Sequence, residues 1–198
     1  MTARVLRMGG QARRLGTLVL PSVVALVVAV SSHAARADIP GVPPSVTHGL
    51  QQWGSRAQAV VDHTSGFATL LQAVPRAMVA CNQPLGRPYL AGGITSAAGA
   101  FLGFVHIAAQ GEVSLYALSK QFKTALQKSR YVASLDRVGT VFDNLLQVGK
   151  NAQTVGSKIS SGDCGTASGL ASMTAGTLLL DIKKLDGALA QLQAAYGM

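Results

Sequence analysis

Two cysteines, Cys81 and Cys164, are the residues of this 198-residue chain with the most readily assigned chemistry. Because the chain contains no third cysteine, an oxidising compartment predicts that the two form one intramolecular disulfide. The alternative is a reactive thiol at Cys164, within the sequence SGDCG. We disfavour it because no histidine lies nearby in the sequence to activate the thiol.

Two histidines, His63 and His106, are the candidates for a metal or haem site. They stand about 20 residues before and about 22 residues after the centre of a loop near 81–88, which in an antiparallel hairpin places them within ~3 Å of the same height. Helical bundles hold haem and metals between such side chains. No CxxCH or Glu-x-x-His motif accompanies them. We therefore expect core histidines and no cofactor, with a haem or metal site as an alternative.

The sequence lacks the motifs of common enzymes. It has no Gly-x-Ser-x-Gly, and Asp62 and His63 are adjacent, so on a helix their side chains do not face each other. Gly92 and Gly93 belong to neither a dinucleotide-binding motif nor a P-loop. With eight acidic residues in the whole chain, paired carboxylates are scarce. We therefore expect a protein that is not an enzyme.

Basic residues gather in one stretch, where only Asp136 opposes them. One interpretation is a face that contacts anionic lipid, polysaccharide or an acidic partner. The other, which we favour, is an ordinary solvated helix face. The basic residues are Lys120, Lys123, Lys128, Arg130 and Arg137.

Residues 1–37 have the composition of a secretory signal peptide. They contain five arginines and no acid, and they surround an uncharged block at 17–31. Ala35 and Ala37 occupy the two small positions of a cleavage site. This predicts export to the periplasm, the cell surface or the medium. A twin-arginine signal, a mitochondrial transit peptide and an uncleaved membrane anchor are the alternatives.

Cleavage after Ala37 leaves a mildly basic chain. Its 12 basic and eight acidic residues give a net charge of +4, which is too small to indicate nucleic-acid binding. The leader at 38–45 contains three prolines, which prevent a helix there. The remainder, 46–198, has the length of a single domain.

Apolar residues recur at steps of three and four through four segments, which predicts helices and no strands. Pro75 is expected to kink or end the first helix. In the third, the apolar stripes fall out of phase near 129–135, which predicts a kink or break. The expected fold is all-α, an antiparallel bundle of four or five helices with one disulfide. The segments are about 46–80, 89–110, 111–160 (beginning after Gly111) and 166–195.

The segment 90–109 contains no charged residue. It is either a buried core helix, which we favour, or a membrane-inserted helix, since its length suffices to span a bilayer. Small residues at every fourth position, here and in 166–195, predict close contacts with neighbouring helices. These residues are Gly99, Gly103, Ala167, Ala171 and Ala175.

In an up-down-up-down bundle, the loops that hold Cys81 and Cys164 lie at the same end. A disulfide between them would hold the starts of 89–110 and 166–195 side by side. The segment 111–160 is about twice as long as 89–110 and must therefore overhang the bundle or break. A full hairpin within it would separate the two cysteines.

These features together predict an exported, non-enzymatic bundle that acts as a structural or binding component. Its setting would be the cell envelope or a secretion or surface assembly, with envelope proteins as partners and the oligomeric state left open. The alternatives are a membrane-inserted subunit through 90–109 and a haem or metal carrier through His63 and His106.

Overall fold

Four long helices make up most of the part of the chain that the structure describes, residues 39–198. In this computed structural model they are α1 (Pro44–Ala73), α3 (Gly86–Leu118), α4 (Ala125–Ser160) and α5 (Cys164–Tyr196). The short helix α2 (Met78–Asn82) and the 3-10 turns η1 (Val74–Ala77) and η2 (Ser119–Gln121) connect them. No strand occurs within 39–198, so the expected all-α fold is confirmed. The signal peptide expected over 1–37 lies outside the described residues.

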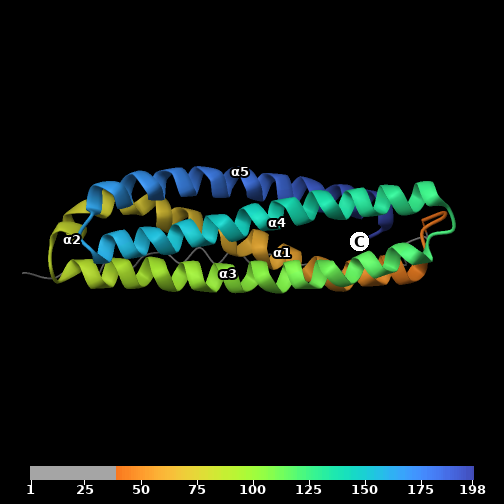
Figure 1. Ribbon diagram of the computed structural model, residues 1–198, viewed down its shortest axis with the longest axis horizontal. Coiled ribbons are helices and arrows are strands. Elements are labelled where there is room, and N and C mark those ends of the chain that lie inside the picture. Colours follow the sequence, from red (N-terminus) through yellow and green to blue (C-terminus); the bar gives the residue numbers. More distant parts are fainter. Residues whose placement is uncertain (1–38) are drawn as a thin grey trace, which may run out of the picture. The chain divides into compact units, whose positions relative to one another are not determined.

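The long helices form an antiparallel ring in which each packs against two others (Figure 1). α1 contacts α3 and α5, and α4 contacts the same two helices on the other side. α3 and α5 therefore lie across the diagonal of the ring. The expectation that their starts lie side by side was wrong, because α1 and α4 lie between these two helices. The short helix α2 packs on both of them and connects their starts.

Two prolines bound α1. Pro44 is its first residue, a position where the missing N–H would have no partner in any case. At the other end α1 stops at Ala73, and Pro75 lies within the 3-10 turn η1 that follows. The structure thus shows the interruption expected at Pro75.

The turn between α3 and α4 lies at 119–124, away from both places where the sequence suggested an interruption. α3 continues through Gly111 to Leu118, and α4 is unbroken through 129–135, so both expectations were wrong. A Cβ on Gly111 would lie 2.8 Å from Cδ1 of Trp53, which shows that this glycine allows α1 and α3 to approach. With the turn here, α3 has 33 residues and α4 has 36, so α4 neither overhangs nor folds back.

An apolar side chain and a cap fix the position of this turn. The Thr124 hydroxyl accepts a hydrogen bond from the Gln127 N–H at 3.2 Å and caps α4. Phe122 folds inward, with its ring centroid 5.1 Å from that of Tyr131 and 6.1 Å from that of Tyr196. Burying an aromatic ring inside the turn makes this the place where the chain reverses.

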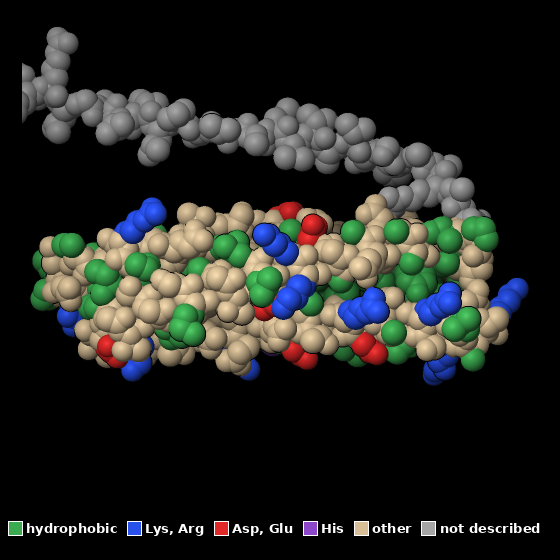
Figure 2. Space-filling model, turned by 90° about the horizontal axis from the view of Figure 1, so that it is seen from above, with side chains coloured by type: hydrophobic (Ala, Val, Ile, Leu, Met, Phe, Trp, Pro, Cys, Tyr) green, Lys and Arg blue, Asp and Glu red, His purple; other side chains and the backbone are tan. Residues whose placement is uncertain are grey.

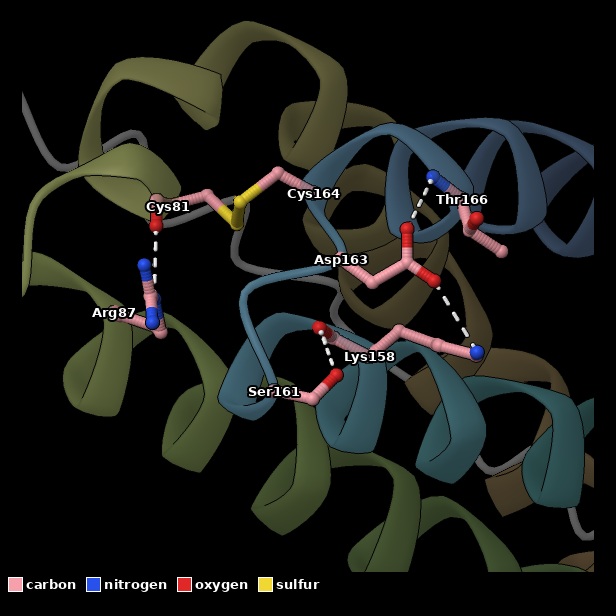
Figure 3. The surroundings of a disulfide bond; sticks show 7 residues. All are labelled: Cys81, Arg87, Lys158, Ser161, Asp163, Cys164 and Thr166. Carbon is pink, nitrogen blue, oxygen red and sulfur yellow. Dashed lines mark hydrogen bonds and ion pairs between the residues drawn. A yellow bond between two sulfur atoms is a disulfide. The ribbon is translucent and has the colours of Figure 1, made fainter.

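Cys81 on α2 and Cys164 at the start of α5 form a disulfide at the opposite end of the bundle (Figure 3). Their Cα atoms are 6.0 Å apart, and both residues are buried. The predicted disulfide is confirmed, as is the placement of the two loops at one end. Arg87 Nε donates a hydrogen bond to the Cys81 carbonyl at 3.1 Å, which ties the start of α3 to α2.

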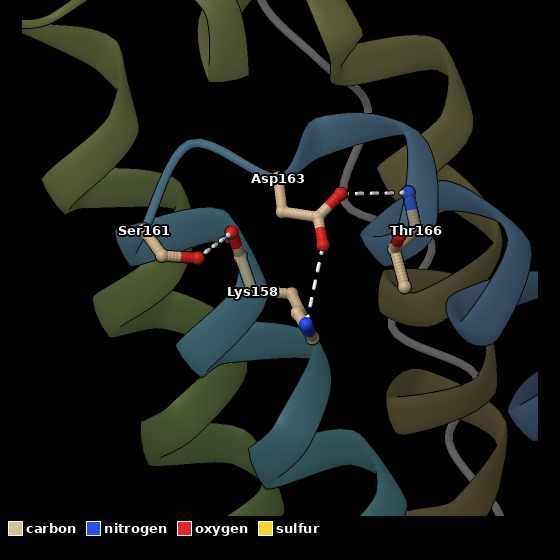
Figure 4. A network of polar contacts seen from close by, with 4 residues as sticks. All are labelled: Lys158, Ser161, Asp163 and Thr166. Carbon is tan, nitrogen blue, oxygen red and sulfur yellow. Dashed lines mark hydrogen bonds and ion pairs between the residues drawn. The ribbon is translucent and has the colours of Figure 1, made fainter.

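A tight turn joins α4 to α5 (Figure 4), directly before Cys164. Gly162 has a φ of +82°, a conformation that favours glycine. Asp163 caps α5 by accepting a hydrogen bond from the Thr166 N–H at 3.3 Å, and its other carboxylate oxygen lies 3.2 Å from Lys158 Nζ. These contacts with Thr166 and Lys158 hold the pKa of Asp163 below its ordinary value.

Replacing both cysteines, Cys81→Ser with Cys164→Ser, should lower the melting temperature. The bond joins positions 83 residues apart. The chain-entropy model assigns a loop of that length roughly 4 kcal/mol, which corresponds to about 10 °C for a chain of this size. Circular dichroism melts with and without reductant test this. Reductant should lower the melting temperature of the parent and leave the variant unchanged, and equal melts in oxidising buffer would contradict the prediction.

Candidate functional site

The outer side of α3 carries no Asp, Glu, Lys or Arg between Arg87 and Glu112. Seven of its exposed residues recur at alternating steps of three and four, which forms one stripe along the helix. A Cβ added at Gly92, Gly99 or Gly103 would meet nothing within 4 Å, so the surface is shallow and open. This stripe is the α3 outer face, made up of Tyr89, Gly92, Ser96, Gly99, Gly103, His106 and Gln110.

A second stripe of the same kind runs along α5. No charged residue occurs between Asp163 and Asp181. Beside the stripe, Met173 and Leu180 have exposed fractions of 72% and 55%. The stripe begins at the disulfide end, as the α3 outer face does. It is the α5 outer face, made up of Gly165, Gly169, Ser172 and Gly176.

The small residues singled out in the sequence lie on opposite sides of their helices. Gly99 and Gly103 were expected to contact a neighbouring helix, and this was wrong because both are exposed with open space around them. The larger residues of α3 occupy its inner side and exclude the glycines from it. Ala167, Ala171 and Ala175 are buried on the inner side of α5.

The glycines that let helices approach closely are on α4, and the sequence reasoning missed them. A Cβ on Gly156 would collide with the Thr95 side chain and lie 3.3 Å from the Ala91 carbonyl oxygen of α3. A Cβ on Gly149 would collide with the Leu102 side chain. The signal was a glycine pair at a spacing of two helical turns, on the same side as the apolar stripe of α4.

Alanine at these two kinds of glycine should have opposite effects on stability. Gly99→Ala should raise the free energy of unfolding by about 0.5–1 kcal/mol, because the site is open and alanine favours the helix. Gly156→Ala should lower it by about 1–3 kcal/mol, because the methyl group has no space. Urea unfolding of both variants measures the two effects. A stabilised Gly156→Ala would show that α3 and α4 are not in close contact there.

His63 and His106 do not lie in the core, where they were expected. Both side chains are exposed, on α1 and on the α3 outer face respectively. The His63 ring stacks on Phe104, with 3.9 Å between centroids, and its Nδ1 lies 2.8 Å from the Ala59 carbonyl oxygen. The described residues contain no group of three or more His, Cys, Asp or Glu side chains placed to hold a metal ion. Their distance from the loop predicts only their position along the helix axes. It does not predict which side of each helix the histidine occupies.

A shallow apolar groove of about 190 Å³ runs between α1 and α3 beside His63. The rings of Phe67 and Phe101, both buried, line it and stack with 4.8 Å between centroids. Gly66 has open space at its Cβ position, which leaves the groove accessible. The groove extends the uncharged surface of α3 onto α1, whose residues between Asp62 and Arg76 are also uncharged.

The five basic residues lie at the end of the bundle away from the disulfide and come from three elements. Lys120 is in η2, Lys123 is in the turn, and the other three are on α4. All five are exposed, and Arg137 donates a hydrogen bond to the Gln191 side chain at 3.4 Å. On the face in Figure 2, charged side chains are denser on the half away from α2. The basic residues thus belong to a different surface from the α3 and α5 outer faces.

Glu112 is a buried carboxyl group at the inner boundary of the uncharged region. It is 5% exposed, and a Cβ on Gly139 of α4 would lie 2.8 Å from its Oε1. Burial, assisted by the charges of Asp143 and Asp136, raises the pKa of Glu112 to about 7. The Tyr116 hydroxyl lies 3.3 Å from Glu112 and 2.7 Å from Asp136. Since that hydroxyl has one proton, it donates to Asp136, and a protonated Glu112 donates to the Tyr116 oxygen.

Glu112→Gln should make the protein more stable at pH 8 and leave it nearly unchanged at pH 4. As the pH rises from the ordinary value of 4.5 towards 7, the unfolded chain releases this proton while the folded chain retains it. The folded state therefore loses on the order of 3 kcal/mol over this range. Glutamine stays neutral and avoids that loss. Urea unfolding at both pH values gives the difference between variant and parent, and a difference independent of pH would contradict the assignment.

Comparisons with known proteins identify no relative of this chain. A scan against protein-family models, a search of curated proteins and a search of solved structures each found no significant match. Among the described residues, one helical stretch, Gly86–Gln121, is long and apolar enough to cross a membrane. Only 28% of the most apolar 18 residues of this stretch are buried, in agreement with the open α3 outer face.

Proposed function

We propose that the protein is an exported, non-enzymatic binding or structural component of the cell envelope or of a secretion or surface assembly. The α3 outer face is the observation that carries this proposal. A soluble bundle normally covers its exposed helix sides with about 25–35% charged residues. Here the outer side of α3 offers glycine, serine and a few larger side chains over its whole uncharged length. Such a surface suits close contact with another molecule.

The chemistry of the α3 outer face favours binding over catalysis. The open Cβ positions of Gly92, Gly99 and Gly103 let the backbone of a partner helix approach. His106 is the only imidazole on the face, and no carboxylate shares the stripe with it. The face therefore contributes shape and apolar contact, and it has no paired groups for proton transfer.

Export is supported by the buried disulfide together with the composition of residues 1–37. Disulfides persist in oxidising compartments and are rare where glutathione keeps thiols reduced. The Cys81–Cys164 bond joins the two loops at one end of the bundle, so its formation is compatible with the whole fold. An oxidising envelope or extracellular location is the setting in which this bond would persist.

A membrane-inserted subunit is the second candidate, favoured by the length and composition of α3. Against it, the inner side of α3 is packed in the ring by Ile94, Ala98, Phe101 and Val105. Insertion of 90–109 would have to open these contacts. Extraction of native membranes with alkaline carbonate separates the candidates, because a peripheral bundle is released and an inserted helix is retained.

A charge placed on the α3 outer face should disrupt binding without disturbing the fold. Gly99→Lys puts a cation in the middle of the face, in open space. Gly187→Lys is the matched control, since Gly187 is equally open and lies beyond Asp181 in the charged part of α5. Burying an unpaired lysine in an apolar contact is costly, so we expect at least a tenfold loss of envelope retention for Gly99→Lys alone.

The measurement is the retained fraction and the cross-linked partners after fractionation of the native host. Equal melting temperatures for the two variants establish that both are folded. Equal retention of both variants and the parent would exclude the α3 outer face as the binding surface. An intact chain with free thiols in the cytosol would contradict export.

A further inference from the structure

Three large apolar side chains are exposed together at the disulfide end of the bundle. Leu85 and Tyr89 have exposed fractions of 85% and 84%, the highest among the large hydrophobic residues of 39–198, and Val79 on α2 is 71% exposed. Leu85 directly precedes α3 and Tyr89 is in its first turn, so the two lie on the same side of the helix. α2 packs on α3 and brings Val79 to the same end. These three residues are the disulfide tip.

The charges around the disulfide tip are positive. Arg76 on η1 is exposed and takes part in neither of the two ion pairs found among the described residues. Asp163, the acid nearest the disulfide, is paired with Lys158. Counted from the disulfide end, the first acidic residue within each long helix lies near or beyond the middle of that helix. These acids are Asp62, Glu112, Asp143 and Asp181.

We propose that the disulfide tip docks on an anionic lipid bilayer. The side chains of Leu85, Tyr89 and Val79 enter the interfacial layer, and Arg76 faces the phosphates. Leucine with tyrosine and a nearby cation is the combination that interfacial membrane contacts use, because the tyrosine ring has an apolar body and a polar hydroxyl. The proposal names a partner for the binding component and so rests on the proposed function.

The shape of the disulfide tip favours a bilayer over a second copy of the chain. A stable protein interface buries about 800 Å² on each partner, which needs some 20 residues a side. Three side chains at the convex end of a bundle fall far short of that. A bilayer surrounds a convex tip and needs no matching surface. The Cys81–Cys164 bond holds α2 against the start of α5, so the tip meets the membrane already ordered.

Vesicle binding of the purified, disulfide-bonded protein tests the proposal. The probes are vesicles of mixed phosphatidylglycerol and phosphatidylcholine, compared with phosphatidylcholine alone. Leu85→Ser with Tyr89→Ser should weaken binding to the anionic vesicles at least tenfold, and Arg76→Gln about fivefold. Leu126→Ser is the matched control, because Leu126 is 60% exposed at the opposite end and its loss should change nothing. All variants carry the same N-terminus, so residues 1–37 contribute equally to each measured binding.

A tryptophan at the tip gives an independent measurement. Trp53, the only native tryptophan, is 3% exposed and supplies a constant background. Leu85→Trp should show a blue-shifted emission on anionic vesicles, and Leu126→Trp should not. Tip-independent binding, no binding to anionic vesicles, or self-association lost in the tip variant would each overturn the proposal. These assays use purified protein, so their failure leaves the test of export and envelope retention intact.

Discussion

Between Arg87 and Glu112 the α3 helix has no charged side chain, and a ring of four helices covers only one of its sides. The hydrophobic effect decides which side is covered. Ile94, Phe101 and Val105 turn inward, and the outer side is mostly glycine and other small residues, with Tyr89 and Ile107 as its large apolar side chains. The outer side therefore exposes little apolar area for each residue. This arrangement allows so apolar a helix to belong to a bundle without presenting a row of large hydrophobic side chains.

The same distribution makes the core thin at the disulfide end. On α3 and α5 the buried residues nearest that end are largely alanines, including Ala91, Ala98, Ala167 and Ala171. A buried alanine contributes far less apolar area than leucine, so each turn of helix gains less from packing. Two features compensate. The glycines of α4 bring its backbone close to α3, and the disulfide ties α2 to the start of α5. The opposite end relies on the aromatic rings around Tyr131.

Periodicity was enough to predict an all-α chain, and together with an up-down-up-down topology it predicted the common location of the two cysteines, although it misplaced the end of α3. Helical periodicity depends only on which positions are apolar, and Pro75 interrupts a helix through its own ring and missing N–H. Both signals can therefore be read without knowing the neighbouring helices. Glycine was harder to interpret. Gly111 looked like a helix end and Gly99 like a helix contact, yet one packs on Trp53 and the other faces solvent. The role of a glycine depends on what lies opposite it, and that information belongs to the partner helix.

The candidate site shows the same limit. Small-residue spacing singled out α3 and α5, but it placed Gly103 against a neighbouring helix and missed Gly156 on α4, which is in such a contact. Loop distance set the height of His63 and His106 along the axis, while their exposure depends on rotation about it. Each error at the candidate site concerned the angle around a helix. In the uncharged stretches of α3 and α5, small residues occur on the inner as well as the outer side, which reduces the hydrophobic contrast that normally fixes this angle.

The two ends of the bundle and its uncharged sides would serve different contacts. A helix the length of α3 spans about 50 Å, so a bundle seated on a bilayer by the disulfide tip holds Lys120 and Lys123 far beyond a Debye length from the headgroups. Arg76 and Arg87, both at the disulfide end, are then the arginines nearest the headgroups. Apart from Tyr89, which belongs to both surfaces, the α3 and α5 outer faces run along the helices and point parallel to the membrane. Lipid at the tip therefore leaves the rest of both faces open to proteins beside the bundle.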